Sequence, residues 1–399
     1  MELVLDTIER YRRLYGSEPS VVATAPGRVN LIGEHTDYND GFVLPVSIDR
    51  TIAIAAGPRS DNMLYLHTAD LQASVSVSLA DLRFEADALW TNYPKGVAHT
   101  LQTQGYRLRG ANFCIRGNIP IGAGLSSSAA LEVASALVFR DLNDIPLSNL
   151  RLIQVACQSE HEFVSVHCGI MDQFVSVMGR KDHALFLDCR SLDFSYVPIP
   201  AGVRLVICDT GVRRELALSA YNQRRAECEE AVREIEKQIP GVRSLREIGL
   251  EKFRTLEKSL SPVSRKRALH VISENDRVTK SVEAMQSNDL SALGTLMIQS
   301  HISLCDNYEV SSRELNAFVD IATAADGVYG ARMTGAGFGG SVICLVDEKK
   351  VDGLVHRIRQ EYPRIAGRSL TVYLTFPGDG AAIIHPAQSL TPVPVAQTS

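Results

Sequence analysis

The segment from Gly117 to Val133, GNIPIGAGLSSSAALEV, constrains the fold of this chain more than any other stretch. A strand-like run at 111–116 leads into it, and a helical pattern of apolar residues covers 126–142. A strand, a glycine loop and a helix N-terminus in this order leave backbone N–H groups unpaired, and the helix dipole favours negative charge there. Gly122 and Gly124 allow the backbone to approach a bulky anion closely. The segment therefore predicts a phosphate site.

Three consecutive serines, Ser126, Ser127 and Ser128, begin the predicted helix. Their hydroxyls can bond phosphate oxygens or a metal ion, whereas the simpler alternative is a glycine turn followed by one serine N-cap. Two known phosphate loops are excluded. The chain contains no G-x-x-x-x-G-K-[ST] motif, and the dinucleotide pattern G-x-G-x-x-G fails at its third glycine, where Ser127 stands.

Composition excludes several classes of partner. The net charge of −5 gives no general attraction to nucleic acid or to membranes. No apolar run is long enough to span a membrane, and the N-terminal sequence lacks the apolar core of a signal peptide. The eight cysteines are scattered without a C-x-x-C motif, which indicates reduced thiols in a cytoplasmic protein.

The order of predicted elements favours an α+β protein over a doubly wound sheet. Predicted helices cover 2–15, 90–104, 126–142, 148–163, 169–179, most of 215–300 and 348–361. Predicted strands cover 21–25, 51–56, 63–67, 73–77, 111–116, 184–188, 194–198, 204–209, 328–334, 342–346 and 369–374. A boundary near residue 200 divides the chain into domains 1–200 and 201–385, with a disordered tail at 386–399.

A polar loop follows the first predicted strand. It carries Glu34, His35, Asp37 and Tyr38 within five positions, after Arg28 and a Pro-Gly turn. Acidic, imidazole and phenol groups can each accept or donate a hydrogen bond to a sugar hydroxyl. A solvated loop is the alternative.

Two acids follow the phosphate loop. Ser128 and Glu160 offer the oxygen ligands that Mg²⁺ prefers, and Asp172 can hold an acceptor hydroxyl for phosphoryl transfer. The alternative is that both acids are solvated side chains on helices. His161, Glu162 and His167 do not have the spacing of a helical zinc protease, and no G-x-S-x-G hydrolase motif is present.

These segments resemble the motifs of the galactokinases. GRVNLIGEHTDYNDGFVLP at 27–45 is similar to the galactokinase signature, and PIGAGLSSSAALEVA at 120–134 to the second motif of the GHMP kinases. CGIMDQF at 168–174 resembles the catalytic segment, and YNQRRAECEEA at 221–231 the segment with the sugar-side tyrosine. DNYEVSSREL at 306–315 and RMTGAGFGGS at 332–341 complete a set that spans nearly the whole chain in order.

The departures from the family pattern are small. Ser341 stands where a cysteine is common, and Cys305–Asp306–Asn307 replaces a more usual Arg-Asp-Asp. Neither departure affects the positions with central roles.

The resemblance implies a role for each matching position. Asp172 is implied to be the catalytic base or orienting acid, and Arg28 to stabilise charge on the transferring phosphoryl group. The implied sugar-binding residues are Glu34, His35, Thr36, Asp37, Gly169 and Tyr221. The implied ATP-binding residues are Gly122, Ala123, Gly124, Leu125, Ser126, Ser127 and Ser128, and Ser128 with Glu160 is implied to hold Mg²⁺.

The implied fold is that of the GHMP kinases, with an N-terminal α+β domain like the second domain of ribosomal protein S5, a ferredoxin-like C-terminal domain and the active site between them. The implied activity is ATP-dependent phosphorylation of the anomeric hydroxyl of D-galactose, carried out by a cytoplasmic monomer with small-molecule substrates. Two alternatives stay open. One is a related sugar kinase for arabinose or N-acetylgalactosamine, and the other is a non-catalytic galactose sensor.

Overall fold

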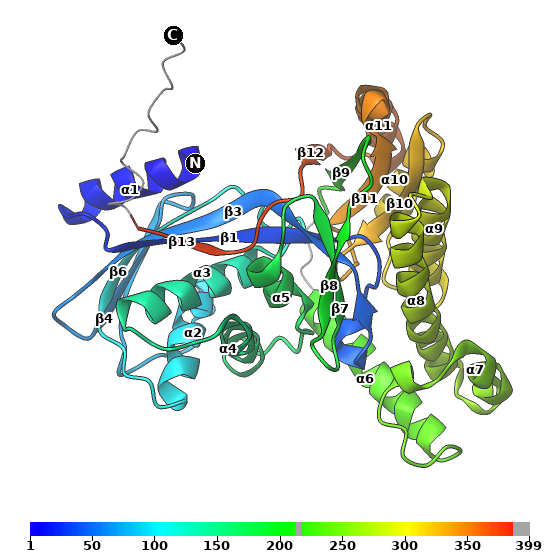
Figure 1. Cartoon of the computed structure of the whole chain (residues 1–399), viewed down its shortest axis with the longest axis horizontal. Coiled ribbons are helices and arrows are strands. Elements are labelled where there is room, and N and C mark those ends of the chain that lie inside the picture. Colours follow the sequence, from blue (N-terminus) through cyan, green and yellow to red (C-terminus); the bar gives the residue numbers. More distant parts are fainter. Residues whose placement is uncertain (213–216, 386–399) are drawn as a thin grey trace, which may run out of the picture.

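The N-terminal half is built on a six-stranded sheet in the order β13-β1-β3-β6-β4-β5 (Figure 1). The computed structural model describes residues 1–212 and 217–385. The strands of this sheet are β1 (Val21–Asn30), β3 (Pro45–Pro58), β4 (Met63–Thr68), β5 (Ala73–Ser78), β6 (Ala111–Gly117) and β13 (Ala382–Ile384). Strands β4 and β6 pair in parallel, and the other neighbours in the sheet pair antiparallel.

Helices cover both faces of this sheet. Successive side chains of a strand point to opposite faces, and in the central strands both sets are apolar. Val22 on β1 and Ala55 on β3 pack under Ile8 and Tyr11 of α1 (Glu2–Tyr15). The neighbouring side chains, such as Val21 and Ile54, belong to the larger core beneath the other helices. Those helices are α2 (Asn92–Thr103), α3 (Ser127–Leu142), α4 (Asn149–Glu162) and α5 (Met171–Met178).

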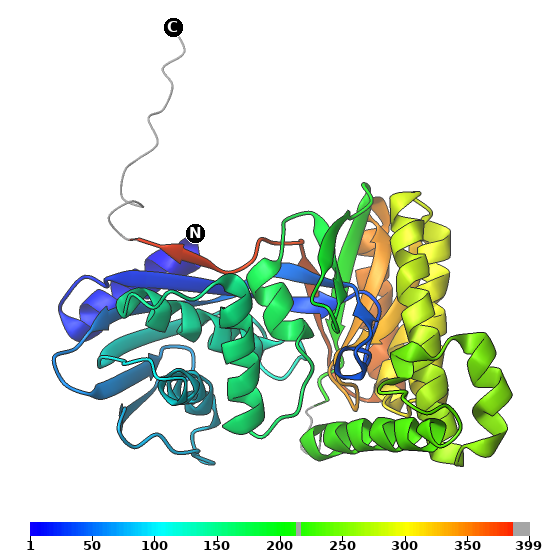
Figure 2. The same cartoon turned by 60° about the horizontal axis from the view of Figure 1, so that its bottom comes forward.

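The C-terminal half contains an antiparallel sheet in the order β10-β11-β9-β12 (Figure 2). Its strands are β9 (Val203–Asp209), β10 (Val328–Thr334), β11 (Ser341–Asp347) and β12 (Thr371–Thr375). The helices of this half are α6 (Ala217–Glu236), α7 (Leu250–Leu256), α8 (Pro262–Gln286), α9 (Leu290–Asp306), α10 (Arg313–Thr323) and α11 (Val351–Ala366). A smaller sheet, β2-β7-β8, is formed by Phe42–Val43, His183–Asp188 and Phe194–Pro198.

Local sequence accounts for the beginnings of several helices. The side chains of Ser148, Ser261, Asp289 and Ser312 accept hydrogen bonds from backbone N–H groups of α4, α8, α9 and α10, respectively. Helix α8 also begins with Pro262, which fits a first turn because its missing N–H would be unpaired there.

The two halves share one core. Leu205, Ile207 and Ile343 of the C-terminal sheet belong to the same buried apolar cluster as the N-terminal sheet and α3. Strand β13 returns from the C-terminal half to pair with β1. The proposed domain boundary at residue 200 therefore stays a prediction, since the chain crosses between the halves more than once.

The α+β prediction is confirmed, although several elements differ in detail. The first strand extends to Asn30 instead of ending at Ala25. Strands β2 and β13 and helix α10 were not predicted as separate elements. The predicted disordered tail at 386–399 lies outside the described residues.

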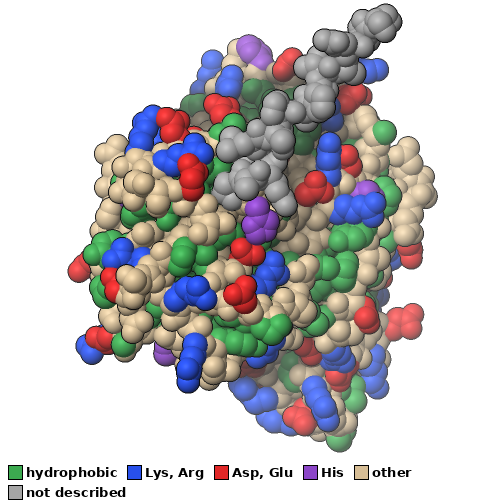
Figure 3. All heavy atoms as spheres, turned by 60° about the vertical axis from the view of Figure 1, so that its left-hand side comes forward, with side chains coloured by type: hydrophobic (Ala, Val, Ile, Leu, Met, Phe, Trp, Pro, Cys, Tyr) green, Lys and Arg blue, Asp and Glu red, His purple; other side chains and the backbone are tan. Residues whose placement is uncertain are grey.

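Charges of both signs are interspersed over the face of the N-terminal half in Figure 3. Within the part of the chain that the structure describes, no helix is long and apolar enough to cross a membrane.

Candidate active site

The predicted phosphate loop leads from β6 into α3 and forms one wall of a cavity of about 520 Å³. Gly122 and Gly124 have φ of 79° and 78°, which a residue with a Cβ rarely adopts. Ser126 also has a positive φ, of 58°. The serines of the loop and the N-terminus of α3 therefore lie at the cavity, and the helix N-terminus favours an anion there.

Three hydrogen bonds to backbone carbonyls fix the conformation of this loop. Arg28 donates from its backbone N–H to the carbonyl of Leu125 (3.2 Å) and from Nη1 to that of Gly124 (2.8 Å). Ser341 Oγ donates to the carbonyl of Ala123 (2.7 Å). Ala123 is buried and, unlike its neighbours in the loop, does not line the cavity. It is placed to anchor the loop.

Arg28 and Asp172 form a bidentate ion pair at the floor of the cavity. Arg28 Nε donates to Asp172 Oδ1 and Nη2 donates to Oδ2, both at 2.7 Å. The hydroxyl of Ser126 also donates to Asp172 Oδ2. Arg28 is buried, whereas the Asp172 side chain is 25% exposed. Planar guanidinium and carboxylate groups fix each other's orientation, so Asp172 has a defined direction and still faces the cavity.

The second wall comes from the polar loop after β1. Glu34 is fixed by hydrogen bonds from Asn30 Nδ2 (2.7 Å) and from the backbone N–H of Gly335 (2.5 Å). His35 Nδ1 lies 2.8 Å from Tyr38 Oη, and burial holds the His35 pKa well below its usual range. The His35 ring centroid is 5.5 Å from that of Tyr221 on α6. The uncharged imidazole of His35, the phenol of Tyr221 and the carboxylate of Glu34 therefore converge on one end of the cavity.

Asp37 lies on the same wall in close contact with Gly169. Burial, followed by the charge of Asp172, raises the pKa of Asp37 to about 7. A Cβ placed on Gly169 would lie 2.0 Å from Asp37 Oδ2. Position 169 therefore requires glycine, because any side chain there would overlap the carboxylate of Asp37. Thr36, in contrast, is buried and donates to the carbonyl oxygens of Gly33 (2.8 Å) and Phe42 (2.7 Å), and it does not line the cavity.

A group of acids lies on the other side of the serines. Gln173 Nε2 donates to Glu160 Oε2 (2.6 Å) and to Glu132 Oε2 (3.1 Å), so one amide joins two buried carboxyl groups. Burial raises the pKa of Glu160 to about 7, and burial with the charge of Glu160 raises that of Glu132 well above its usual range. These carboxyl groups beside Ser128 offer the oxygen ligands that a hard divalent cation prefers, and the charge of such an ion would favour their ionised form.

Fourteen of the sixteen predicted site residues line this one cavity, and Thr36 and Ala123 do not. Six further lining residues had no predicted role: Tyr93, Val166, Cys168, Met171, Gly335 and Ala336. Gly335 lies in the motif at 332–341 and Cys168 and Met171 in the motif at 168–174, so sequence pointed to these segments without giving the residues a role. Tyr93 and Val166 lie outside every motif quoted for the family.

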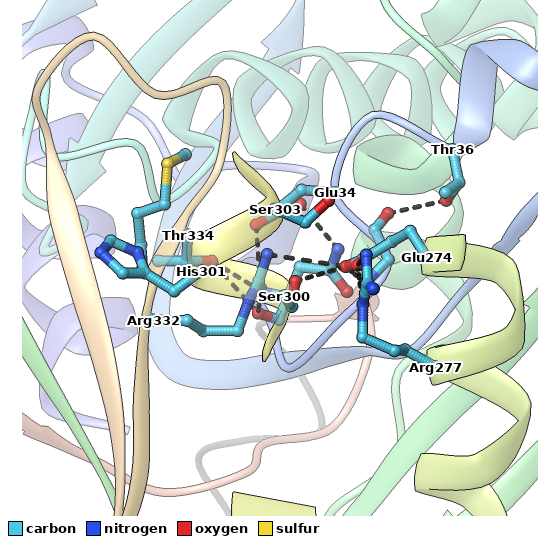
Figure 4. Close-up of polar contacts among 12 residues, drawn as sticks. Glu34, Thr36, Glu274, Arg277, Ser300, His301, Ser303, Arg332 and Thr334 are labelled. Carbon is cyan, nitrogen blue, oxygen red and sulfur yellow. Dashed lines mark hydrogen bonds and ion pairs between the residues drawn. The ribbon is translucent and has the colours of Figure 1, made fainter. Parts of the chain in front are cut away.

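A buried ionic network that includes Glu274 and Arg332 binds the backbone of the polar loop after β1 (Figure 4). Glu274 on α8 accepts from the backbone N–H of Gly33 (3.0 Å), from Ser300 Oγ (2.5 Å) and from Arg277 Nε (2.7 Å). Arg332 on β10 donates to the carbonyl of Asn30 (3.0 Å). The α8 and β10 side chains thus fix the segment that carries Glu34.

The glycine and serine loop at a helix N-terminus, and an acid paired with an arginine next to it, define a small-molecule kinase of the GHMP class. The family models for the GHMP kinase N-terminal and C-terminal domains match residues 92–180 and 281–364. The mevalonate kinase of Methanococcus jannaschii shares this fold, with a TM-score of 0.63 at 18% identity over 92% of this chain and all of that chain. The predicted GHMP kinase fold is confirmed.

The model of the galactokinase galactose-binding signature matches residues 9–58. Galactokinases of Roseiflexus sp. and Chloroflexus aurantiacus are 45% and 44% identical over 93% and 95% of this chain, covering 95% and 97% of their own lengths. The crystal structure of Lactococcus lactis galactokinase complexed with galactose superposes with a TM-score of 0.91 at 34% identity, over 95% of this chain and 99% of that chain. The chain belongs to the galactokinase family, and it is a kinase.

Proposed function

We propose that this enzyme transfers the γ-phosphoryl group of ATP to the anomeric hydroxyl of D-galactose, giving galactose 1-phosphate. The observation that carries the proposal is the position of the Arg28–Asp172 pair. It lies between the phosphate loop on one side and Glu34, His35 and Asp37 on the other, within one cavity. A phosphate donor and a polyhydroxylated acceptor would therefore meet at Asp172.

In the proposed reaction, Asp172 accepts a hydrogen bond from the acceptor hydroxyl and orients it toward the γ-phosphorus atom. Arg28 holds Asp172 in position through two hydrogen bonds, and its guanidinium stabilises negative charge that develops on the transferring group. The transition state of phosphoryl transfer is loose, so the hydroxyl proton leaves late and orientation contributes strongly. Glu34, His35, Asp37, Gly169 and Tyr221 hold the sugar.

The N–H groups and hydroxyls from Gly122 to Ser128 bind the phosphates of ATP, which fits their exposure at the start of α3. Ser128 and Glu160 would hold Mg²⁺. Their oxygen donors and the surplus of buried acid beside them support this assignment. When bound, the ion neutralises charge on the phosphate oxygens.

The enzyme acts as a monomer in the cytoplasm. All eight cysteines are free thiols, which supports a reducing compartment.

An assay of ATP with a panel of sugars tests the substrate. Galactose is expected to be phosphorylated with the highest kcat/KM, ahead of arabinose and N-acetylgalactosamine. A preference for either of the other sugars would replace the proposal with a related sugar kinase. Binding of both ligands with no turnover would indicate a galactose sensor, against which the intact serine loop, Arg28 and Asp172 argue.

Asp172→Asn tests the mechanism. Asn has nearly the same shape as Asp but lacks its charge and its capacity to take a proton. We expect kcat to fall by roughly 10²–10⁴-fold, the usual range for a positioned acid–base group. Galactose affinity, measured by calorimetry, is expected to change much less, because other side chains hold most of the sugar. A purely structural Asp172 would instead lower thermal stability and leave single-turnover rates of the folded variant near those of the parent.

A further inference from the structure

A cluster of two thiols and an imidazole lies beside the active-site cavity. Cys157 and His161 stand one turn apart on α4, and Cys168 lies in the segment between α4 and α5. The Cys157 and Cys168 sulfurs and a ring nitrogen of His161 all lie within 4.8 Å of one another. All three residues are half-buried, so an ion from solvent can reach them. Neither Cys157 nor His161 has a role in the proposed reaction.

The spacing of these atoms fits a tetrahedral metal site. Metal–sulfur and metal–nitrogen bonds of about 2.3 and 2.0 Å place the two ligand atoms roughly 3.6 Å apart at a tetrahedral angle. Cys157 Sγ and His161 Nε2 lie 3.7 Å apart. One hydrogen bond must give way, because His161 Nε2 also lies 2.6 Å from the carbonyl oxygen of Cys168.

The ligand types select a particular class of ion. Thiolate and imidazole ligands prefer Zn²⁺ and similar soft or borderline cations, whereas Mg²⁺ prefers oxygen. This cluster therefore differs in chemistry from the oxygen donors of Ser128 and Glu160. The two sites are nevertheless in contact, because Cys168 Sγ donates to Glu160 Oε2 at 3.1 Å.

We propose that Cys157, His161 and Cys168 form a binding site for Zn²⁺ or a similar thiophilic divalent cation, and that its occupancy inhibits the enzyme. Binding releases the thiol protons of Cys157 and Cys168 and leaves a fourth position for water or Glu160. The inhibitory part rests on the proposed function. Cys168 lines the cavity and directly precedes Gly169, so drawing its sulfur toward the metal removes a donor from Glu160 and shifts the glycine that contacts Asp37.

Cobalt binding tests the site without reference to activity. The full chain, kept reduced with a phosphine so that no disulfide forms, is titrated with Co²⁺. We expect one equivalent to bind with a thiolate-to-cobalt charge-transfer band and the visible bands of tetrahedral cobalt, and Zn²⁺ to displace it. Cys157→Ser should weaken binding at least about tenfold, since even residues that only support a ligand change metal affinity by about 10–100-fold.

The chain offers a matched control on α9. Cys305 Sγ lies 3.6 Å from His301 Nε2, again one helical turn away. Among the described residues, no third cysteine, histidine or acid completes a ligand set with this pair. Cys305→Ser should therefore leave cobalt binding unchanged. An octahedral spectrum without a thiolate band, or equal affinity in Cys157→Ser and the parent, would overturn the site.

Zinc inhibition tests the second half of the proposal. Added Zn²⁺ is expected to reduce the rate of the parent and of Cys305→Ser at saturating Mg²⁺. Cys157→Ser should keep its basal rate and need at least about tenfold more Zn²⁺ for the same inhibition. Zinc that binds without slowing the parent would refute inhibition while leaving the site in place. If galactose is not phosphorylated at all, the proposed function fails, and the cobalt titration still decides the site.

Discussion

Gly169 has no space for a side chain, although its backbone conformation is open to other residues. A methyl group there would meet the carboxylate of Asp37 at 2.0 Å and its Cβ at 2.6 Å. Overpacking of this kind costs about 1–3 kcal/mol. Gly169→Ala is therefore expected to weaken galactose binding by roughly 10-fold or more, as measured by calorimetry.

Gly353 on α11 supplies the control for this substitution, because no atom lies within 4 Å of the methyl group that alanine would add. Gly353→Ala should bind galactose like the parent. If Gly169→Ala binds within about twofold of the parent, less than the cost of overpacking, the contact with Asp37 does not shape the sugar site.

Glu160 links metal binding to pH. Its pKa of about 7, raised mainly by burial, means that the carboxyl group is largely protonated below neutral pH in the free enzyme. Mg²⁺ needs the ionised form, so the Mg²⁺ concentration for half-maximal rate should rise as pH falls below about 7. Glu160→Gln should raise this concentration at pH 8 and flatten its dependence on pH. The parent assayed at the same pH and ATP concentration controls for protonation of ATP, and identical titrations would remove Glu160 from the metal site.

At the scale of elements, local patterns predicted what depends on neighbours in sequence. The predicted bounds of most helices and strands lie within a few residues of those in the structure, because apolar periodicity is a property of each segment. Strand β13 was missed, since only three residues form it and its partners on β1 lie about 360 positions earlier. Ser126 shows a second limit. The alternative of a plain serine N-cap was reasonable, yet its side chain makes no cap and donates to Asp172 instead.

Strand β13 covers an edge that β1 would otherwise expose. Ala382, Ile383 and Ile384 pair with Thr24, Ala23 and Val22. The few backbone hydrogen bonds of this ladder contribute a net of about 0.5–1.5 kcal/mol each, and an uncovered edge favours aggregation. A chain that ends at residue 381 should have a lower midpoint of thermal unfolding and scatter more light on heating than a chain that ends at residue 385. Both should have a similar kcat, because β13 does not line the cavity. Equal midpoints would show that the edge needs no cover.

At the scale of the whole molecule, the candidate site depends on contacts between segments that the sequence keeps far apart. The motifs predicted fourteen of the residues that line the cavity, because the residue types within each short segment already indicate a binding role. The roles of Glu274 and Arg332 could not be predicted, since an acid and an arginine on separate elements give no local pattern. Both are fully buried, and they hold the segment at 30–34 against α8 and β10 (Figure 4). The cavity wall that carries Glu34 is thus an N-terminal loop whose position is set by side chains of the C-terminal half.

This network should make stability depend on Glu274 and on pH. Burial alone would raise the pKa of Glu274, but the charges of Arg277 and its neighbours outweigh burial and lower it from 4.5 to about 2. Because this pKa is lower in the folded protein than in the unfolded chain, the ionised carboxylate stabilises the fold above pH 4.5. That contribution, on the order of 3 kcal/mol, is lost as pH falls toward 2.

Glu274→Gln is expected to lower the free energy of unfolding by about 3–5 kcal/mol at pH 7, because two arginines lose their buried partner. The difference from the parent, measured by urea unfolding, should shrink as pH is lowered from above 4.5 toward 3. Glu309 is the control: its pKa is also about 2, but its side chain is 42% exposed. It pairs with the exposed Lys266 and with Arg267, which is buried but keeps a second partner in Glu227. Solvent screens such pairs, so Glu309→Gln should cost less than about 1 kcal/mol. Equal losses in the two variants, or a Glu274→Gln difference that does not change with pH, would show that the buried network does not hold the two halves together.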